Sequence, residues 1–136
     1  MEIQHEESFE KELGTQMQLF VYRNPKKDHD AMVNLQKEFR DLFTKLGDSP
    51  RYEVFHLDNF ESPMDGISNI AKVVSANQDE EVWVEILSYK NRKHLEEHCE
   101  KCKRDESMSA LYQKFMNLVT PTAGFVMGDF SRTSGY

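Results

Sequence analysis

Residues 81–108 read EVWVEILSYKNRKHLEEHCEKCKRDESM, an apolar segment that passes directly into a charged one. The apolar part, residues 81–89, is rich in β-branched and aromatic residues, which predicts a strand. Asn91 is a favourable N-cap residue, so the charged part predicts a helix that begins there and runs to about Arg104. We therefore expect a strand joined to a helix by a short turn around Lys90.

The same kinds of pattern extend to both sides. Three further segments have the residue types and alternation of strands: 17–23, 51–59 and 124–130. One helix is predicted from Asp28 or Asp30, either of which can cap it, to Gly47. Another follows residue 108 at helical spacing and ends before Pro121. Residues 60–78 predict a loop followed by a short helix or an irregular strand.

The order β-α-β-β-α-β is the ferredoxin-like motif, an α+β fold with an antiparallel sheet. Residues 17–136 are expected to form one domain of this kind, because the length is in the range of a single hydrophobic core. Residues 1–16 are acidic and carry few large apolar side chains. They predict a flexible arm or a short docking helix.

The run YKNRKH at 89–94, followed by Asp105 and Met108, resembles the signature of the YbaA-like proteins. In that uncharacterised family a strand ends in Tyr-Lys-Ser-Arg, and a His, a polar helix, an Asp and a Met follow. Two more segments agree in order. NPKK at 24–27 resembles the family's Val-Pro-Lys-Lys, and VMGDF at 126–130 resembles its last strand, which ends in Gly-Gly-Phe.

The similarity covers about residues 17–130, with three departures. Asn91 stands where Ser is usual, Asp129 stands where Gly is usual, and the segment 117–123 is longer and lacks the usual Phe-Asp. The resemblance implies membership of the dimeric α/β-barrel superfamily, in which two sheets face each other as a barrel.

The strand at 81–89 also predicts assembly from its own alternation. Large apolar side chains fall on both faces, with Val82, Val84 and Ile86 on one and Trp83, Leu87 and Tyr89 on the other. Two crossover helices can cover only one face of a four-stranded sheet. The second face would leave an apolar patch larger than monomers usually expose, so we expect a homodimer.

Composition limits the partners and the compartment. A formal charge of −7 argues against nucleic acid or an anionic membrane as the main partner, since both attract basic patches. No apolar run approaches the ~20 residues of a membrane span, and the first residues lack a signal-peptide pattern. Two cysteines three residues apart fit a reducing compartment. A cytoplasmic location is expected.

The predicted helix 91–104 holds four potential metal ligands, His94, His98, Cys99 and Cys102. From the first to the last a helix rises about 12 Å, whereas zinc ligands lie only ~2.0 to 2.3 Å from the ion. We therefore predict no metal site and no cofactor, with Leu95 and the two cysteines forming a buried stripe. The Cys-x-x-Cys pair lies inside the helix, away from the N-terminal position of redox motifs.

Glu85 is the first candidate for chemistry, because alternation places its carboxylate among large apolar side chains. Such a group must be paired, hydrated or raised in pKa. A small-molecule pocket around it would be lined by Trp83, Tyr89, Tyr52 and His56. The alternative is that Glu85 meets solvent or a basic side chain on a neighbouring strand.

His94 is the second candidate, as an acid or base in the first turn of a helix directly after a strand. Its alternative role is to bond a nearby carbonyl or carboxylate and fix the junction between strand and helix. Neither candidate belongs to a recognisable catalytic motif.

Three classes of function remain open on the sequence. The first is a small-molecule-binding homodimer with its site in the barrel or between sheet and helices. The second is a cofactor-independent enzyme of monooxygenase or isomerase type, which rests on fold analogy alone. The third is a purely structural or regulatory dimer. Binding is the leading hypothesis, and whether the chain is an enzyme is left undecided.

Overall fold

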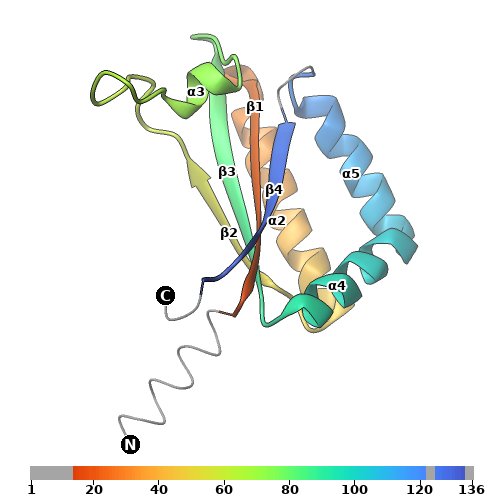
Figure 1. Cartoon of the computed structure of the whole chain (residues 1–136). Coiled ribbons are helices and arrows are strands. Elements are labelled where there is room, and N and C mark those ends of the chain that lie inside the picture. The colour runs from red at the N-terminus through yellow and green to blue at the C-terminus, as the bar shows by residue number, and fades with distance from the viewer. Residues whose placement is uncertain (1–13, 122–124, 134–136) are drawn as a thin grey trace, which may run out of the picture.

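The computed structural model describes residues 14–121 and 125–133 of the 136-residue chain. Within this part, four strands form one antiparallel sheet, and the long helices lie together on one of its faces (Figure 1). The elements in chain order are β1 (Gln16–Pro25), the 3₁₀ turn η1 (Lys26–Asp28), α2 (His29–Leu46), β2 (Arg51–His56), α3 (Ile70–Val73), β3 (Glu80–Tyr89), α4 (Arg92–Arg104), α5 (Glu106–Leu118) and β4 (Phe125–Ser131). The predicted α+β, ferredoxin-like fold is confirmed.

The sheet has the strand order β2-β3-β1-β4, so the two central strands come from the two halves of the chain. β1 pairs with β3 over its whole length, with Tyr22 opposite Trp83 and Phe20 opposite Glu85. β2 lies on the other side of β3, where His56 is opposite Trp83. This register puts the even-numbered residues of β1 and β2 on the same face as the odd-numbered residues of β3.

Local capping explains where the helices begin and end. The Asn91 side chain accepts a hydrogen bond from the backbone N–H of His94 at 2.9 Å, as the sequence predicts for the start of α4. Asp105 caps α5 in the same way. α2 ends at Leu46, and its C-cap residue Gly47 has a φ of +82°, a value that suits glycine. The predicted side-chain cap of α2 was wrong: Asp28 occupies the N-cap position without making a capping hydrogen bond, because η1 leads the chain directly into the helix.

Several predicted strand boundaries differ from the structure by one to three residues, and β1 runs two residues past its predicted end, to Pro25. β2 ends at His56, three residues before its predicted end at Asn59. Residues 60–78 contain the single-turn helix α3, which Asn69 caps through a hydrogen bond to the N–H of Ala71. The predicted acidic arm falls mostly on residues 1–13, outside the described residues. Its last residue, Gln16, already belongs to β1.

The main core lies between the sheet and the helices α2, α4 and α5. One cluster is built around Tyr22, Trp83 and Phe115, and a second around Phe43 and Tyr89. The predicted buried stripe of α4 was partly wrong. Leu95 is buried, but His94 and His98 are buried beside it, and Cys99 and Cys102 are only partly covered. His94 takes its position because both of its ring nitrogens have hydrogen-bonding partners there, whereas among the described residues His98 has only the Cys102 thiol as a polar partner, through Nε2.

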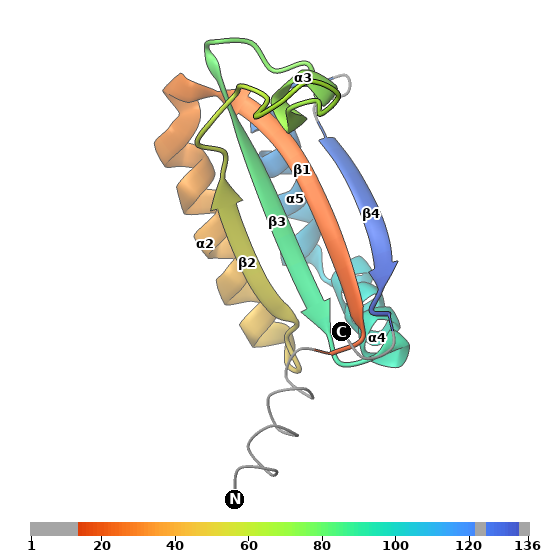
Figure 2. The ribbon, with the colours of Figure 1, turned by 60° about the vertical axis from the view of Figure 1, so that its left-hand side comes forward.

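The opposite face of the sheet is only partly covered. Figure 2 shows α3 over one end of this face, with α2 and α5 behind the sheet. Ala71 and Val74 of the α3 segment pack there against Val21 and Val82. Further along the face, apolar side chains are partly or largely exposed: Leu19, Val84, Ile86, Phe55, Val126 and Phe130. Among the described residues, no helix is long and apolar enough to cross a membrane.

Candidate functional site

The residues predicted to line a pocket all lie on the helix-covered face of the sheet, but they do not meet in one place. β3 carries Trp83, Glu85 and Tyr89 on this face, and Trp83 and Tyr89 are separated by about 20 Å at the usual rise of a strand. β2 places Tyr52 opposite Leu87, and His56 opposite Trp83. The structure therefore divides the predicted site into three neighbourhoods along β3.

The middle neighbourhood is built around Glu85. Its carboxylate accepts a short hydrogen bond from the Tyr22 hydroxyl, and Gln36 donates to the same hydroxyl at 2.8 Å. Burial raises the pKa of Glu85, and the hydrogen bond from Tyr22 offsets this only in part. Burial and the nearby carboxylate raise the pKa of Tyr52 as well. Glu85 thus sits on the central strand among aromatic residues, as the sequence predicts, with phenolic partners in place of a basic one.

The neighbourhood of Tyr89 contains a pocket of about 460 Å³ between the sheet and helices α4 and α5. Apolar groups make up most of its walls, including Phe20, Leu87 and Met108. Polar atoms come from few residues. The Tyr89 hydroxyl donates to the Gln18 side chain at 2.7 Å, which fixes both at the pocket wall. Tyr89 is the one predicted ligand-binding residue that lines this pocket.

His98 and the cysteines of α4 line the same pocket. The Cys102 thiol lies 3.4 Å from Nε2 of His98, and within the described residues Nδ1 of His98 has no hydrogen-bond partner. Burial lowers the pKa of His98 to about 4 and raises the pKa of the Cys102 thiol to about 11. At neutral pH both groups are therefore uncharged, and the thiol is a poor nucleophile.

His94 lies at the junction of β3 and α4, away from this pocket. Nδ1 of its ring accepts a hydrogen bond from the backbone N–H of Lys90 at 3.0 Å, and Nε2 lies 2.6 Å from the backbone carbonyl oxygen of Asp48. The ring is thus engaged through both nitrogens and joins the start of α4 to the loop after α2. This is the geometry of the positioning role that the sequence left as an alternative.

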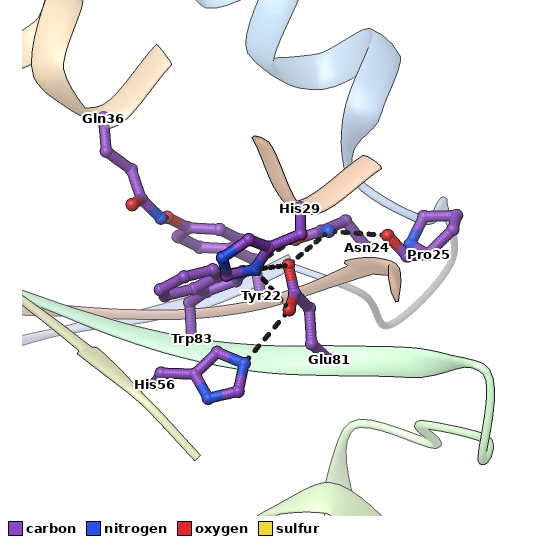
Figure 3. A network of polar contacts seen from close by, with 8 residues as sticks. All are labelled: Tyr22, Asn24, Pro25, His29, Gln36, His56, Glu81 and Trp83. Atoms are coloured by element: carbon purple, nitrogen blue, oxygen red, sulfur yellow. Dashed lines mark hydrogen bonds and ion pairs between the residues drawn. The ribbon is translucent and has the colours of Figure 1, made fainter. Parts of the chain in front are cut away.

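The third neighbourhood surrounds Glu81 and is shown in Figure 3. The Glu81 carboxylate lies between two imidazole rings, with Oε2 at 2.9 Å from Nδ1 of His29 and at 3.0 Å from Nε2 of His56. His29 is the first residue of α2, and His56 is the last of β2. Three segments distant in the sequence therefore bring these groups together.

A second layer of polar groups holds Glu81 in place. Asn24 donates from Nδ2 to Oε1 of Glu81 at 3.0 Å, and the Trp83 indole donates to Oδ1 of Asn24 at 2.8 Å. The Trp83 ring stacks on His29 at 5.7 Å and meets His56 edge-on at 4.7 Å. Burial raises the pKa of Glu81, but the hydrogen bonds from Asn24 and the two histidines outweigh it and hold that pKa below its ordinary value.

The sequence predictions included His56 and Trp83 but missed His29, Asn24 and Glu81. Glu81 directly follows Asp79 and Glu80 at the start of β3, so the sequence does not distinguish it from its acidic neighbours. One available signal was the pair of histidines in two predicted elements, His29 at the start of a helix and His56 in the second half of the strand 51–59. Nothing in the spacing shows that these two positions adjoin.

The chain is similar to known proteins in sequence and in fold. The family model described as "Protein of unknown function (DUF1428)" matches residues 15–118. A NIPSNAP family protein of Agrobacterium tumefaciens has a similar structure, with a TM-score of 0.54, 12% sequence identity and 90% of each chain covered. A conserved protein of Methanosarcina mazei Go1 is similar at a TM-score of 0.53 and 9% identity, over 92% of this chain and 99% of the other. No functionally curated protein matches the chain. These structural likenesses show the fold alone.

Proposed function

The chain belongs to the DUF1428 family of proteins of unknown function, and we propose that it binds a small, mostly apolar molecule in the pocket between the sheet, α4 and α5. The pocket itself carries this proposal. Its volume of about 460 Å³ falls within the range of about 300–1,000 Å³ typical of small-molecule sites. Its walls combine apolar side chains with a few fixed polar groups, among them Gln18 and Tyr89, which is the mixture that gives both affinity and orientation.

The charges around the pocket favour a ligand that has an apolar body and one hydrogen-bonding group. His98 is neutral at pH 7 because burial lowers its pKa to about 4, so the inner wall carries no cation from that residue. Lys103 also lines the pocket, and its side chain is largely exposed. A polar or anionic end of a ligand would therefore face Lys103, and its apolar part would contact Phe20 and Leu87.

A dye titration tests the pocket directly. We expect 1-anilinonaphthalene-8-sulfonate to bind with increased fluorescence, because it has an apolar body and one anionic group. Ser109→Trp would fill the pocket from α5 and should weaken dye binding at least tenfold. Ser107→Trp is the matched control, since Ser107 is on the same helix but lines a different groove.

Equal dye affinity in the two tryptophan variants would contradict the pocket proposal. Native mass spectrometry of the purified protein adds an independent measurement, because a retained ligand would increase the mass of the wild-type chain and be lost from Ser109→Trp. Circular dichroism confirms that both variants are folded.

We propose that the protein is a homodimer, with the uncovered sheet face as its interface. The support is the row of apolar side chains beyond α3, which includes Phe55 at 51% exposure and Phe130 at 48%. An exposed apolar face of this kind is buried most simply against the same face of a second copy. The barrel of facing sheets implied by the YbaA-like resemblance would have this geometry. We also propose that the chain is one of the YbaA-like proteins, on the basis of the run YKNRKH at residues 89–94.

Sedimentation equilibrium tests the assembly. The wild-type protein should have twice the 16.0 kDa mass of one chain. Ile86→Glu, on the uncovered face of the central strand β3, should give monomers because it places a charge in the apolar interface. Met116→Glu is the control on the helix layer, where 38% of Met116 is exposed, and it should leave the dimer intact. A wild-type monomer would contradict the proposal.

A cytoplasmic location belongs to the same proposal, supported by two free cysteines. A cofactor-independent enzyme remains the alternative, in which Glu85 would serve as the acid because of its raised pKa. A purely structural or regulatory dimer is the other alternative. It predicts that neither the dye nor a retained ligand occupies the pocket.

A further inference from the structure

His29, His56 and Glu81 present three donor atoms to one point at the end of the sheet opposite the Tyr89 pocket. Nδ1 of His29, Nε2 of His56 and a carboxylate oxygen of Glu81 all lie within 4.8 Å of one another. The same oxygen, Oε2, is 2.9 Å from one nitrogen and 3.0 Å from the other. A tetrahedral ion with ligands at about 2.0–2.2 Å holds neighbouring donors about 3.4 Å apart. The two nitrogen–oxygen contacts therefore need to lengthen by a few tenths of an ångström, and the two nitrogens, which lie within 4.8 Å of each other, need to approach by at most about 1.4 Å.

We propose that His29, His56 and Glu81 bind a divalent transition-metal ion, of which zinc is the representative. Two imidazoles with one carboxylate form a donor set that suits zinc, iron, cobalt or nickel. Magnesium and calcium prefer oxygen ligands alone, so this set disfavours them. The prediction that no metal site exists was based only on the four potential ligands of α4, which are neighbours in the sequence. His29, His56 and Glu81 are far apart in the sequence and were not grouped.

The surroundings hold the three ligands as a metal centre requires. The chain of hydrogen bonds from Trp83 to Asn24 to Glu81 fixes the carboxylate, and only 6% of the Glu81 side chain is exposed. Such outer contacts orient ligands and tune a bound metal. The Trp83 ring packs against both imidazoles and limits their rotation. The carboxylate is ionised at neutral pH, as ligation requires.

The exposed side of the cluster leaves room for further ligands. The side chains of His29 and His56 are 47% and 42% exposed, so solvent reaches the two nitrogen ligands. Three protein ligands and an open position are the arrangement of catalytic zinc sites, whereas structural sites use four protein ligands. A bound ion would therefore carry water or an oxygen ligand from solution.

The main alternative is that the two histidines simply donate hydrogen bonds to one carboxylate oxygen. The position of His29 in the first turn of α2 supports the hydrogen-bonding alternative, because the positive end of the helix dipole disfavours a bound cation there. The buried Glu81 carboxylate lies between the imidazoles and offsets this charge. The two arrangements differ in what they bind, which makes them separable by experiment.

The test uses the full chain after tag removal and treatment with a chelator. Isothermal titration with zinc chloride should show one ion bound per chain, and cobalt(II) should give visible absorption bands of nitrogen and oxygen ligation. His56→Ala and Glu81→Gln should each weaken zinc binding at least tenfold. Both His29 and His56 are partly exposed, so His29→Ala and His56→Ala are expected to fold. A loss of zinc binding in either variant would therefore report the loss of a ligand and not unfolding.

The matched control concerns His98 and the two thiols of α4. A variant that combines His98→Asn, Cys99→Ser and Cys102→Ser removes three of the four potential metal ligands of α4 and should leave zinc binding unchanged. The proposal is overturned if wild-type protein binds no zinc, if His56→Ala binds it as tightly as wild type, or if the α4 variant abolishes binding. Because the Tyr89 pocket lies about 27 Å along β3 from Glu81, the dye and zinc titrations can fail independently.

Discussion

Arg23 on β1 and Glu80 on β3 form a buried ion pair, in which Nη1 of the guanidinium lies 2.5 and 2.6 Å from the two carboxylate oxygens. Glu80 also accepts hydrogen bonds from the Thr120 hydroxyl at 2.5 Å and from the backbone N–H of Asn77 at 3.0 Å. The pair therefore ties the two central strands to the segment after α5 and to the turn before β3.

Loss of the Arg23 cation should destabilise the fold strongly. Arg23→Met leaves the Glu80 carboxylate buried without its charged partner, and we expect the free energy of unfolding to fall by about 3–5 kcal/mol. Arg51→Met is the control, because the pair of Arg51 with Glu53 at 3.4 Å is half-exposed and should contribute about 0–1 kcal/mol. Urea unfolding monitored by Trp83 fluorescence measures both. Equal losses in the two variants would contradict the expectation.

Gly14 should tolerate a side chain much less well than Gly47. Both have positive φ, at +69° and +82°, but an added Cβ at Gly14 would lie 1.9 Å from the Tyr89 carbonyl oxygen, whereas nothing lies within 4 Å at Gly47. Gly47→Ala should therefore cost only the backbone strain, about 1 kcal/mol, and Gly14→Ala about 2–4 kcal/mol. Thermal unfolding and amide exchange at Thr15, which donates to Tyr89, measure the difference. The expectation fails if Gly47→Ala is the more harmful change.

His98 should make stability fall as the solution becomes mildly acidic. Its folded pKa of about 4 lies below the ordinary value of 6.5, so the unfolded chain takes up a proton first. The stabilisation is complete above about pH 6.5 and is lost progressively toward pH 4, with a total of about 3 kcal/mol from this group. His98→Gln removes the titrating group and should flatten the curve of unfolding free energy against pH in that window. An unchanged slope would contradict the assignment.

Glu85 should affect the pH dependence of stability in the opposite direction to His98. Because its pKa is raised, the folded state favours the protonated carboxyl, and wild-type stability is lost as pH rises through the folded pKa. Glu85→Gln keeps an acceptor for the Tyr22 hydroxyl without the buried charge. We expect it to raise the free energy of unfolding at pH 7 by about 1 kcal/mol and to lose this advantage in acid. Denaturant titrations at pH 7 and pH 4 compare the two proteins. A destabilised variant at pH 7 would instead show that the ionised carboxylate is needed.

Much of the fold was predictable because its causes are local. The alternation of Val82 to Tyr89 depends only on the period of a strand, and it correctly placed Glu85 on the face of Trp83 and Leu87. The Asn91 cap and the Gly47 stop depend on single residues and their immediate neighbours. Where a local rule failed, as at Asp28, the preceding 3₁₀ turn had already set the path of the chain.

The sequence by itself determined the strand and helix order, the faces of each strand and the presence of a second apolar face on the sheet, because all three follow from periodicity and local backbone chemistry. Only the tertiary structure decided which side chains meet. It placed His94 against the Asp48 carbonyl, separated Tyr89 from Trp83, and brought His29 and His56 to Glu81. The physical reason is that those contacts depend on strand register and on how elements far apart in the chain pack, and neither is encoded in residue spacing.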